Sequence, residues 1–226
     1  MKISEIFRSL QGEGRYAGNP SVFIRFAGCN LRCKFGNSIC DTPYASYSPE
    51  INRMTLKEVD AKLNELVQDS DDIVITGGEP SMHFEAIMEL SKLPVFRNRR
   101  VTVETNGTLA VRWPELWFLS ISPKLTSAGN EFDLFEYGSV IRAITWERDY
   151  QLKFVVDGRK ETFQEVREFV GQCGFAAHTR TVLMPEGVTA EDVDNNLETV
   201  AHLALENGMM FTDRLHLRIW GNSRGT

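Results

Sequence analysis

Three of the chain's four cysteines, Cys29, Cys33 and Cys40, lie within twelve residues of the stretch G28-C-N-L-R-C-K-F-G-N-S-I-C-D-T42. Three thiolates in one loop could hold three irons of a [4Fe–4S] cluster and leave the fourth iron open to another ligand. A zinc site completed by a remote residue is the alternative, and Cys173 could be that residue. Cys173 falls at the end of a predicted helix, however, where a single cysteine is usually a packing residue. The spacing alone leaves both kinds of site open.

A second candidate site follows a short apolar strand, in the stretch V74-I-T-G-G-E-P80. Gly77 and Gly78 would allow the backbone to approach a ligand closely, and Glu79 could accept hydrogen bonds from an ammonium group. Taken alone, a pair of glycines after a strand is common and indicates no more than a turn.

Together, the two motifs resemble the radical S-adenosylmethionine (SAM) superfamily. In that superfamily three cysteines hold the cluster, SAM chelates the open iron, and the Gly-Gly-Glu-Pro strand holds the amino group of SAM. Along nearly the whole chain the sequence also resembles one branch, the 7-carboxy-7-deazaguanine synthases of the queuosine and 7-deazapurine pathway. The blocks that carry this resemblance, in order, are E5-I-F-R-S-L-Q-G-E-G14, F23-I-R-F-A-G-C29, C40-D-T42, T102-V-E-T-N-G-T108, S122-P-K124, L152-K-F-V-V156, M184-P-E-G187 and R214-L-H-L-R-I-W-G-N222.

The resemblance implies a reaction and a set of site residues. The family converts 6-carboxy-5,6,7,8-tetrahydropterin to 7-carboxy-7-deazaguanine with loss of ammonia, and Mg²⁺ promotes the reaction. A 5′-deoxyadenosyl radical from SAM abstracts the hydrogen, so no catalytic side chain is implied. By resemblance, Cys29, Cys33 and Cys40 bind the cluster, and Thr42 binds Mg²⁺, although such a threonine would otherwise be taken for a helix cap or turn residue. The SAM ligands would be Gly78, Glu79, Ser122, Pro123, Lys124, Met184, Pro185, Glu186 and Gly187, and the substrate ligands Leu10, Gln11, Gly12, Glu13, Arg25, Thr76 and His216.

The substrate residues differ in how well their chemistry supports the role. The glutamine and glutamate of the LQGEG segment can match the row of donors and acceptors along a pterin edge. A lone arginine in a strand usually lies on a solvated face or in an ion pair, but the guanidinium of Arg25 also suits a substrate carboxylate. Thr76 and His216 are weaker candidates, since an isolated histidine in a strand is more often structural. Glu104 and Asn106 could equally shape the turn after their strand.

The cysteine spacing departs from the pattern usual in the superfamily, Cys-x3-Cys-x2-Cys, because six residues separate the second and third cysteines here. The four extra residues lie within the segment 34–39, which carries the turn formers glycine, asparagine and serine at 36–38. Lengthening a flexible loop by this amount costs under ~1 kcal/mol, so the third cysteine can still reach the cluster. The insertion places Ile39 where an aromatic residue often stands near the adenine of SAM, and displaces Phe35.

The elements that must position these motifs alternate between strands and helices. We predict strands at 21–26, 73–76, 101–104, 116–121, 152–156, 181–184 and 215–220, and helices at 55–68, 83–92, 161–173 and 190–207. This order predicts an α/β fold with a mostly parallel sheet: a partial, open barrel of about six parallel strands with helices outside, in a single domain 1–226. Sites in such folds form at the carboxyl ends of strands, where the TGGEP, ETNG, SPK and MPEG segments lie.

The composition and charge of the chain limit the kinds of partner that it could bind. The 226 residues are 42% hydrophobic, enough for a sizeable core, and the net charge of −6 argues against non-specific binding to nucleic acid. The sequence has neither a signal peptide nor a membrane-spanning run, which predicts a cytoplasmic protein with reduced thiols. The resemblance implies a small-molecule pterin substrate, a flavodoxin or ferredoxin as electron donor, and a homodimer. Three alternatives remain: a glycyl-radical activase of the same superfamily, a zinc-stabilised binding module, and a regulator that acts through protein contacts.

Overall fold

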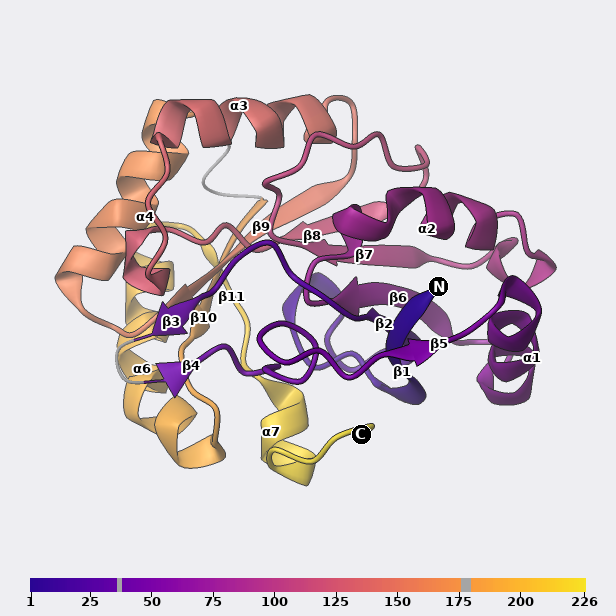
Figure 1. Ribbon diagram of the computed structural model, residues 1–226. Helices are drawn as coiled ribbons and strands as arrows, with labels where there is room; N and C mark the ends of the chain where they lie inside the picture. The colour runs from indigo at the N-terminus through magenta and orange to yellow at the C-terminus, as the bar shows by residue number, and fades with distance from the viewer. Residues whose placement is uncertain (36–37, 176–179) are drawn as a thin grey trace.

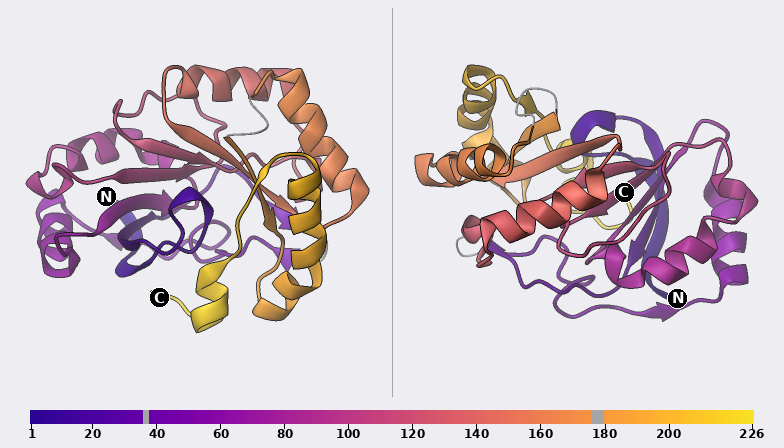
Figure 2. Two further views of the ribbon diagram at one scale, coloured as in Figure 1. Left: turned by 180° about the vertical axis from the view of Figure 1, so that it is seen from behind. Right: turned by 90° about the horizontal axis from the view of Figure 1, so that it is seen from above.

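The computed structural model describes residues 1–35, 38–175 and 180–226, and its main feature is one strongly curved sheet (Figures 1 and 2). Among these residues the sheet has nine strands in the order β11-β10-β9-β8-β7-β6-β2-β1-β5. The strands are β1 (Lys2–Leu10), β2 (Pro20–Phe26), β5 (Asn52–Arg53), β6 (Asp72–Gly77), β7 (Val101–Thr105), β8 (Phe118–Ile121), β9 (Tyr150–Val156), β10 (Thr181–Pro185) and β11 (Met210–Phe211). A separate antiparallel hairpin joins β3 (Lys34–Phe35) to β4 (Ser38–Ile39).

Helices cover the outer face of this sheet (Figures 1 and 2). The covering helices are α1 (Leu56–Leu66), α2 (Phe84–Leu90), α3 (Leu134–Thr145), α4 (Lys160–Gln172) and α6 (Ala190–Glu206). Short 3₁₀ turns lie at Gly14–Tyr16, Pro80–His83, Pro94–Phe96 and Thr126–Ala128, and a last helix, α7, spans Leu215–Trp220. Capping boxes at Thr55 and Thr189 begin α1 and α6.

The predicted fold class is confirmed. The six strands predicted between residues 21 and 184 are β2 and β6–β10; each pairs in parallel with its neighbour, and β11 adds a seventh parallel strand. The strand β1, which the sequence analysis did not predict, pairs antiparallel with β2 and carries the short β5 on its other edge. The sheet is therefore a partial barrel, open between β11 and β5.

Alternation along the strands separates the lumen of this barrel from the core under the helices, because successive side chains in a strand point to opposite faces. On β6–β8 the residues Ile75, Val103 and Leu119 are fully buried in the hydrophobic core. Their neighbours Thr76, Glu104 and Ser120, together with Arg25, Lys153 and Met184 of other strands, line a cavity on the opposite face. In the sequence, each buried strand is therefore an apolar run interrupted by single polar residues, and these polar residues are the ones that face the lumen.

One predicted strand is wrong: residues 215–220 form the helix α7, so His216 lies on a helix. The segment L-H-L-R-I-W alternates over only six residues, too few to distinguish a strand from a helix. In the structure Leu217 is buried whereas Ile219 is 49% exposed, which a strand with both residues on one face would not give. Gly221, at φ 62°, ends the helix. The strand predicted at 116–121 begins at Phe118, because the chain first makes a turn that the Trp117 N–H closes on the Pro114 carbonyl at 3.1 Å, with Leu116 exposed to solvent.

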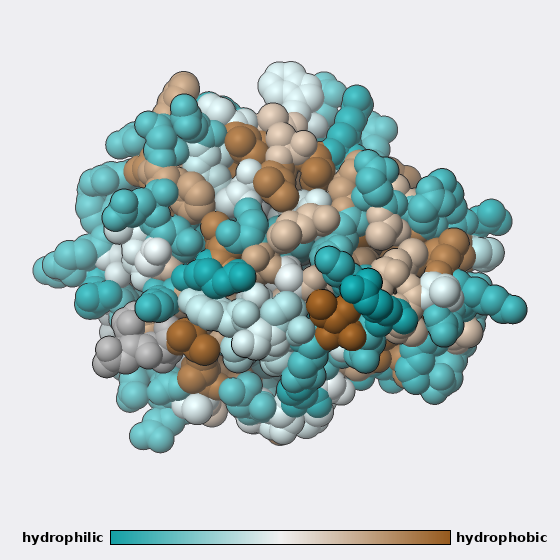
Figure 3. All heavy atoms as spheres, in the orientation of Figure 1, coloured by the Kyte–Doolittle hydropathy of each residue, from teal (hydrophilic) through white to brown (hydrophobic). Residues whose placement is uncertain are grey.

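Among the described residues no helix is long and apolar enough to span a membrane. On the face seen in Figure 3, apolar side chains are scattered among hydrophilic ones and do not gather into one large patch. Scattered exposed apolar residues are normal for a folded protein and mark no site by themselves.

An ion pair with a buried carboxylate fastens β1 to the residue before β6 and gives a testable stability effect. Arg8 donates two hydrogen bonds to the fully buried carboxylate of Asp71, at 2.7 and 3.0 Å, and the Gln68 N–H donates a third at 2.9 Å. The Arg8 hydrogen bond is the main cause that lowers the pKa of Asp71. This stability is therefore present above the ordinary aspartate pKa of about 3.9 and is lost as the pH falls through the lowered value.

We expect Asp71→Asn to lower the free energy of unfolding by about 2 kcal/mol at neutral pH, since it removes charged hydrogen bonds from a buried site. Urea denaturation of the variant and the wild type should show this gap shrinking below about pH 3.9. A gap that stays constant down to acid pH would contradict the assigned role of the carboxylate charge.

Candidate active site

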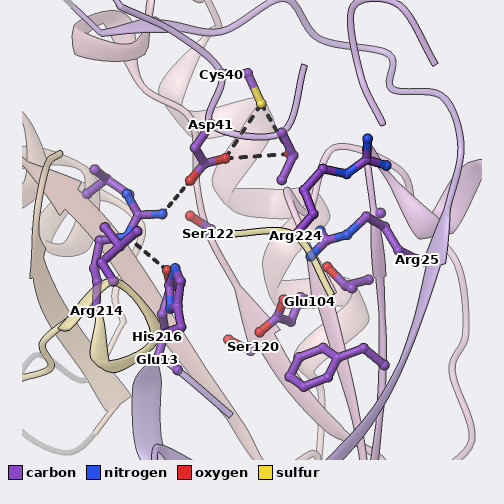
Figure 4. A pocket seen from close by; sticks show the side chains of 18 of the residues that line it. Glu13, Arg25, Cys40, Asp41, Glu104, Ser120, Ser122, Arg214, His216 and Arg224 are labelled. Atoms are coloured by element: carbon purple, nitrogen blue, oxygen red, sulfur yellow. Dashed lines mark hydrogen bonds and ion pairs between the residues drawn. The ribbon is translucent and has the colours of Figure 1, made fainter. Parts of the chain in front are cut away.

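The carboxyl ends of the strands and the loop after β1 enclose a cavity of about 260 Å³ (Figure 4). The residues from the sequence prediction that line it are Leu10, Gln11, Gly12, Glu13, Arg25, Cys29, Cys33, Cys40, Thr42, Thr76, Gly78, Ser122, Lys124, Met184 and His216. The predicted residues Glu79, Pro123, Pro185, Glu186 and Gly187 are not part of its lining. The structure therefore gathers most of the predicted site from segments that are far apart in the chain.

The cysteine loop forms one end of the cavity. The three cysteines are free thiols, and two of their sulfurs accept hydrogen bonds from N–H groups: Leu31 N–H lies 3.4 Å from Cys29 Sγ, and the side-chain amide of Asn130 lies 3.5 Å from Cys33 Sγ. Burial raises the pKa of Cys29 and Cys33, and the charge of Lys124 opposes this shift at Cys33. Three thiols around one cavity, with N–H donors to sulfur, fit a [4Fe–4S] cluster bound through three irons.

The inserted residues between the second and third cysteines form the hairpin β3–β4, in which Lys34 pairs with Ile39 and Phe35 with Ser38. At the base of this hairpin the Cys40 N–H donates a 3.2 Å hydrogen bond to the Cys33 carbonyl. The two cysteines are therefore adjacent in space despite six intervening residues. The turn predicted at 36–38 includes residues 36–37, which lie outside the described part of the chain.

The Gly-Gly-Glu-Pro segment after β6 packs directly against the cysteine loop. A Cβ on Gly78 would lie 2.3 Å from the Gly28 carbonyl oxygen, so only glycine permits this approach. Glu79 is fully buried, and its carboxylate accepts hydrogen bonds from the Ser81 N–H and hydroxyl, the Thr105 hydroxyl and the Asn106 N–H. Burial nevertheless raises the pKa of Glu79. Three of these bonds go to Oε1 and one to Oε2, so Oε2 keeps an acceptor site for an ammonium group.

The loop after β1 closes the opposite end of the cavity. The Gln11 amide donates a 3.1 Å hydrogen bond to Glu104, which lines the cavity from β7. Gly12 packs against the ring of His216, and a Cβ there would lie 2.1 Å from Nδ1. The Leu215 N–H donates to the Gly12 carbonyl at 2.8 Å, which ties this loop to the start of α7. Burial lowers the pKa of His216, which favours the neutral form of its ring.

A buried charge network joins the two ends of the cavity. Glu13 forms ion pairs with Lys153 and, at 3.0 Å, with Arg214. Arg214 also pairs with Asp41, which lies between Cys40 and Thr42 (Figure 4). It donates a further hydrogen bond to the Gly187 carbonyl. Burial alone would raise the pKa of Glu13, but the charges of Lys153 and Arg214 hold it well below the usual range. Sequence reasoning missed these partners, although a lysine within the apolar run of β9 was a signal.

Two predicted residues have partners that shape what they could bind. Arg25 donates from Nε to Glu5 at 2.7 Å, and in the described part of the chain its two terminal nitrogens make no hydrogen bond. Those nitrogens therefore remain available to a carboxylate in the cavity. The Thr42 hydroxyl lies 3.5 Å from both Cys40 Sγ and Asp41 Oδ1. Across the described residues, no three His, Cys, Asp or Glu side chains are grouped to hold a single metal ion.

Comparison with known proteins shows to which superfamily this chain belongs. The sequence model of the family described as Radical SAM superfamily matches residues 23–200, and the chain belongs to that superfamily. It is 35% identical to the 7-carboxy-7-deazaguanine synthase of Halobacterium salinarum, over 100% of this chain and 93% of that protein. It is 37% identical to the enzyme of the same name from Rhodopirellula baltica, over 99% and 88% of the two chains. Within the superfamily, the chain therefore belongs to the 7-carboxy-7-deazaguanine synthase family.

A solved structure supports the fold independently. The crystal structure of QueE from Escherichia coli superposes with a TM-score of 0.68 over 95% of this chain and 94% of that one, at 22% sequence identity. The protein is thus a radical SAM enzyme, and membership of the superfamily implies a [4Fe–4S] cluster and SAM as its cofactors. This family assignment resolves the choice between cluster and zinc that the cysteine spacing left open.

Proposed function

We propose that this enzyme acts in 7-deazaguanine biosynthesis by converting 6-carboxy-5,6,7,8-tetrahydropterin to 7-carboxy-7-deazaguanine with loss of ammonia. The main support for the proposal is a cavity whose two ends differ in chemistry. The cysteine loop lies at one end, and a set of fixed donors and acceptors on β2, β7 and the loop after β1 lies at the other. Membership of the family named for this product supports the same conclusion.

The cluster end would bind the cofactors through the cysteine loop and through residues at the ends of β6, β8 and β10. When bound, the cluster and SAM supply a 5′-deoxyadenosyl radical that abstracts a hydrogen atom from the substrate. Gly78, Ser122, Lys124 and Met184 line this part of the cavity and are proposed to contact SAM, and Lys124 Nζ already donates to Ser122 at 2.6 Å. The residues Glu79, Pro123, Pro185, Glu186 and Gly187 are proposed to complete the SAM site.

The substrate end offers a pattern of polar groups that suits a pterin with a carboxylate. Gln11 and Glu104 present an amide and a carboxylate that could pair with the donors and acceptors of the pterin edge, and an unmatched group in such a buried site is costly. The free nitrogens of Arg25 would receive the substrate carboxylate. Leu10, Gly12, Glu13, Thr76 and His216 are proposed to shape the remaining walls.

The Mg²⁺ ion is proposed to bind the hydroxyl of Thr42. Mg²⁺ keeps several water ligands and usually takes few protein oxygens, often together with substrate oxygens. The structure brings the Thr42 hydroxyl to the cavity wall beside Asp41, whose other carboxylate oxygen is held by Arg214. A site of this kind would assemble only when substrate and ion bind together.

We also propose, from the family resemblance, that residues 1–226 act as one domain in a cytoplasmic homodimer that receives electrons from flavodoxin or ferredoxin.

The decisive experiment is an anaerobic assay. The reconstituted protein, incubated with SAM, a reductant, Mg²⁺ and the carboxytetrahydropterin, is expected to form 7-carboxy-7-deazaguanine, with SAM recovered rather than consumed in proportion to product. Omission of Mg²⁺ should lower the rate. A protein with a full cluster that cleaves SAM but leaves the pterin unchanged would defeat the proposal and favour a glycyl-radical activase.

A further inference from the structure

The open side of the barrel, between β11 and β5, is crossed by the end of the chain (Figure 1). The helix α7 begins soon after β11 and is anchored there by Arg218, which bonds to Asp213 at 3.0 Å and to Asp194 of α6 at 2.5 Å. Residues 221–226, which we call the strap, continue from α7, and residues 222–226 all line the cavity. One end of the strap is thus fixed on the β11 side of the opening.

Arg224 fastens the strap on the other side. Its two terminal nitrogens each lie 3.1 Å from a carboxylate oxygen of Glu50, which precedes β5. The same guanidinium stacks on the ring of Tyr44, 3.7 Å from its centroid. A guanidinium that is held by both oxygens of a carboxylate and stacked on a ring has one preferred orientation. A single charge pair on the surface would not fix its orientation in this way.

The contact between Arg224 and Tyr44 is linked to the substrate end of the cavity by two hydrogen bonds. The Tyr44 hydroxyl donates to Glu5 Oε1 at 2.8 Å, and Arg25 Nε donates to the same oxygen at 2.7 Å. Both guanidinium groups also contact the Tyr44 ring: Cζ of Arg224 lies 3.7 Å from its centroid and Cζ of Arg25 lies 5.9 Å from it. A displacement of Tyr44 would therefore change the position of the Arg25 side chain.

We propose that Arg224 and Glu50 latch the strap over the cavity and that the latch positions Arg25 for the carboxylate of the substrate. The second half of this proposal rests on the proposed function. The side chains of Arg224 and Glu50 are 45% and 57% exposed, so their ion pair favours the closed strap by at most about fivefold, and the stacking contributes a similar factor. A latch of this strength holds the strap closed for most of the time but still allows it to open for the substrate.

The test compares Arg224→Ala with a matched control, Arg167→Ala, which removes an exposed arginine on α4 that does not line the cavity. In the reconstituted holoenzyme Arg224→Ala is expected to raise the KM for the pterin about tenfold, since the competent closed state becomes less populated, and to change kcat by less than about twofold. Glu50→Gln should show a smaller rise because the stacking on Tyr44 remains. The exchanged pair Glu50→Arg with Arg224→Glu should recover part of the loss. A purely structural role would not be restored by this exchange.

A second measurement does not depend on the substrate. NMR order parameters of the backbone in residues 221–226 should be lower in Arg224→Ala and Glu50→Gln than in the wild type or in Arg167→Ala. Equal order parameters in all four proteins would overturn the latch. Lower order parameters with an unchanged KM would overturn the positioning of Arg25, and a wild type that does not turn over the pterin would refute the proposed function while leaving the relaxation test of the latch valid.

Discussion

Replacing Cys33 with alanine is expected to abolish product formation, because two thiolates from this loop cannot hold the cluster. Cys33 is buried at the cavity wall, and its sulfur is already placed by the Asn130 amide. After anaerobic reconstitution the wild type should carry about four irons per chain and absorb in the visible range. The variant should lose most of both, and its rate should fall below detection. Iron analysis and the product assay together measure this result.

Cys173→Ala is the matched control for this prediction. Cys173 is also buried, but it packs against Gly138 between α3 and α4, away from the cavity, and its thiol donates to the Leu134 carbonyl. The control should keep its iron and its activity, at a modest cost in stability. One tightly bound zinc per chain that both variants lose would instead support the zinc site and contradict the cluster.

Arg214→Met is expected to have the largest effect on stability, about 3 kcal/mol or more in the free energy of unfolding of the apoprotein. The Arg214 side chain is 7% exposed and balances Glu13, whose side chain is 14% exposed. Removing one partner of a buried ion pair leaves the other uncompensated, which typically costs about 3–5 kcal/mol. Lys153 still faces Glu13, and Asp41 can be hydrated, so the lower end of that range is expected. Urea denaturation measures the change.

Arg15→Met provides the comparison, because Arg15 pairs with Asp149 through contacts of 2.7 and 2.9 Å on the surface. The side chain of Asp149 is 57% exposed, and a surface pair of this kind contributes at most about 1 kcal/mol. Equal destabilisation by the two variants would show that the buried network does not depend on Arg214. The Arg214 variant should also lose activity, since Glu13 and Asp41 would no longer be held at the two ends of the cavity.

The sequence predicted the parallel sheet well because the local pattern and the burial agree along those strands. Runs such as VFIRF in β2 and LKFVV in β9 are apolar on both faces except where a side chain enters the lumen. The motifs at the strand ends then followed from the rule that parallel strands deliver their carboxyl ends to one edge. The same logic placed Ser122 and Thr76 correctly at the cavity.

What the sequence could not supply is the identity of partners distant in the chain. Arg214 lies 201 residues from Glu13 and 173 from Asp41, and no local pattern specifies either pair. For the same reason the ion pair of Arg25 with Glu5 depends on the antiparallel register of β1 and β2, and β1 itself was not predicted. The short helix α7 was mistaken for a strand because its six residues fit both periods.

Because of the hairpin β3–β4, the distance between Cys33 and Cys40 in space does not depend on how many residues separate them in the chain. Its base is fixed by the backbone hydrogen bond between Cys40 and Cys33, and the extra residues extend beyond that bond. An antiparallel ladder keeps its register when residues are added in pairs, one to each strand. The hairpin is consequently a natural insertion point: it could be lengthened in steps of two, or carry a grafted peptide, while the three thiols keep their positions. Searches that demand a fixed cysteine spacing will overlook proteins built in this way.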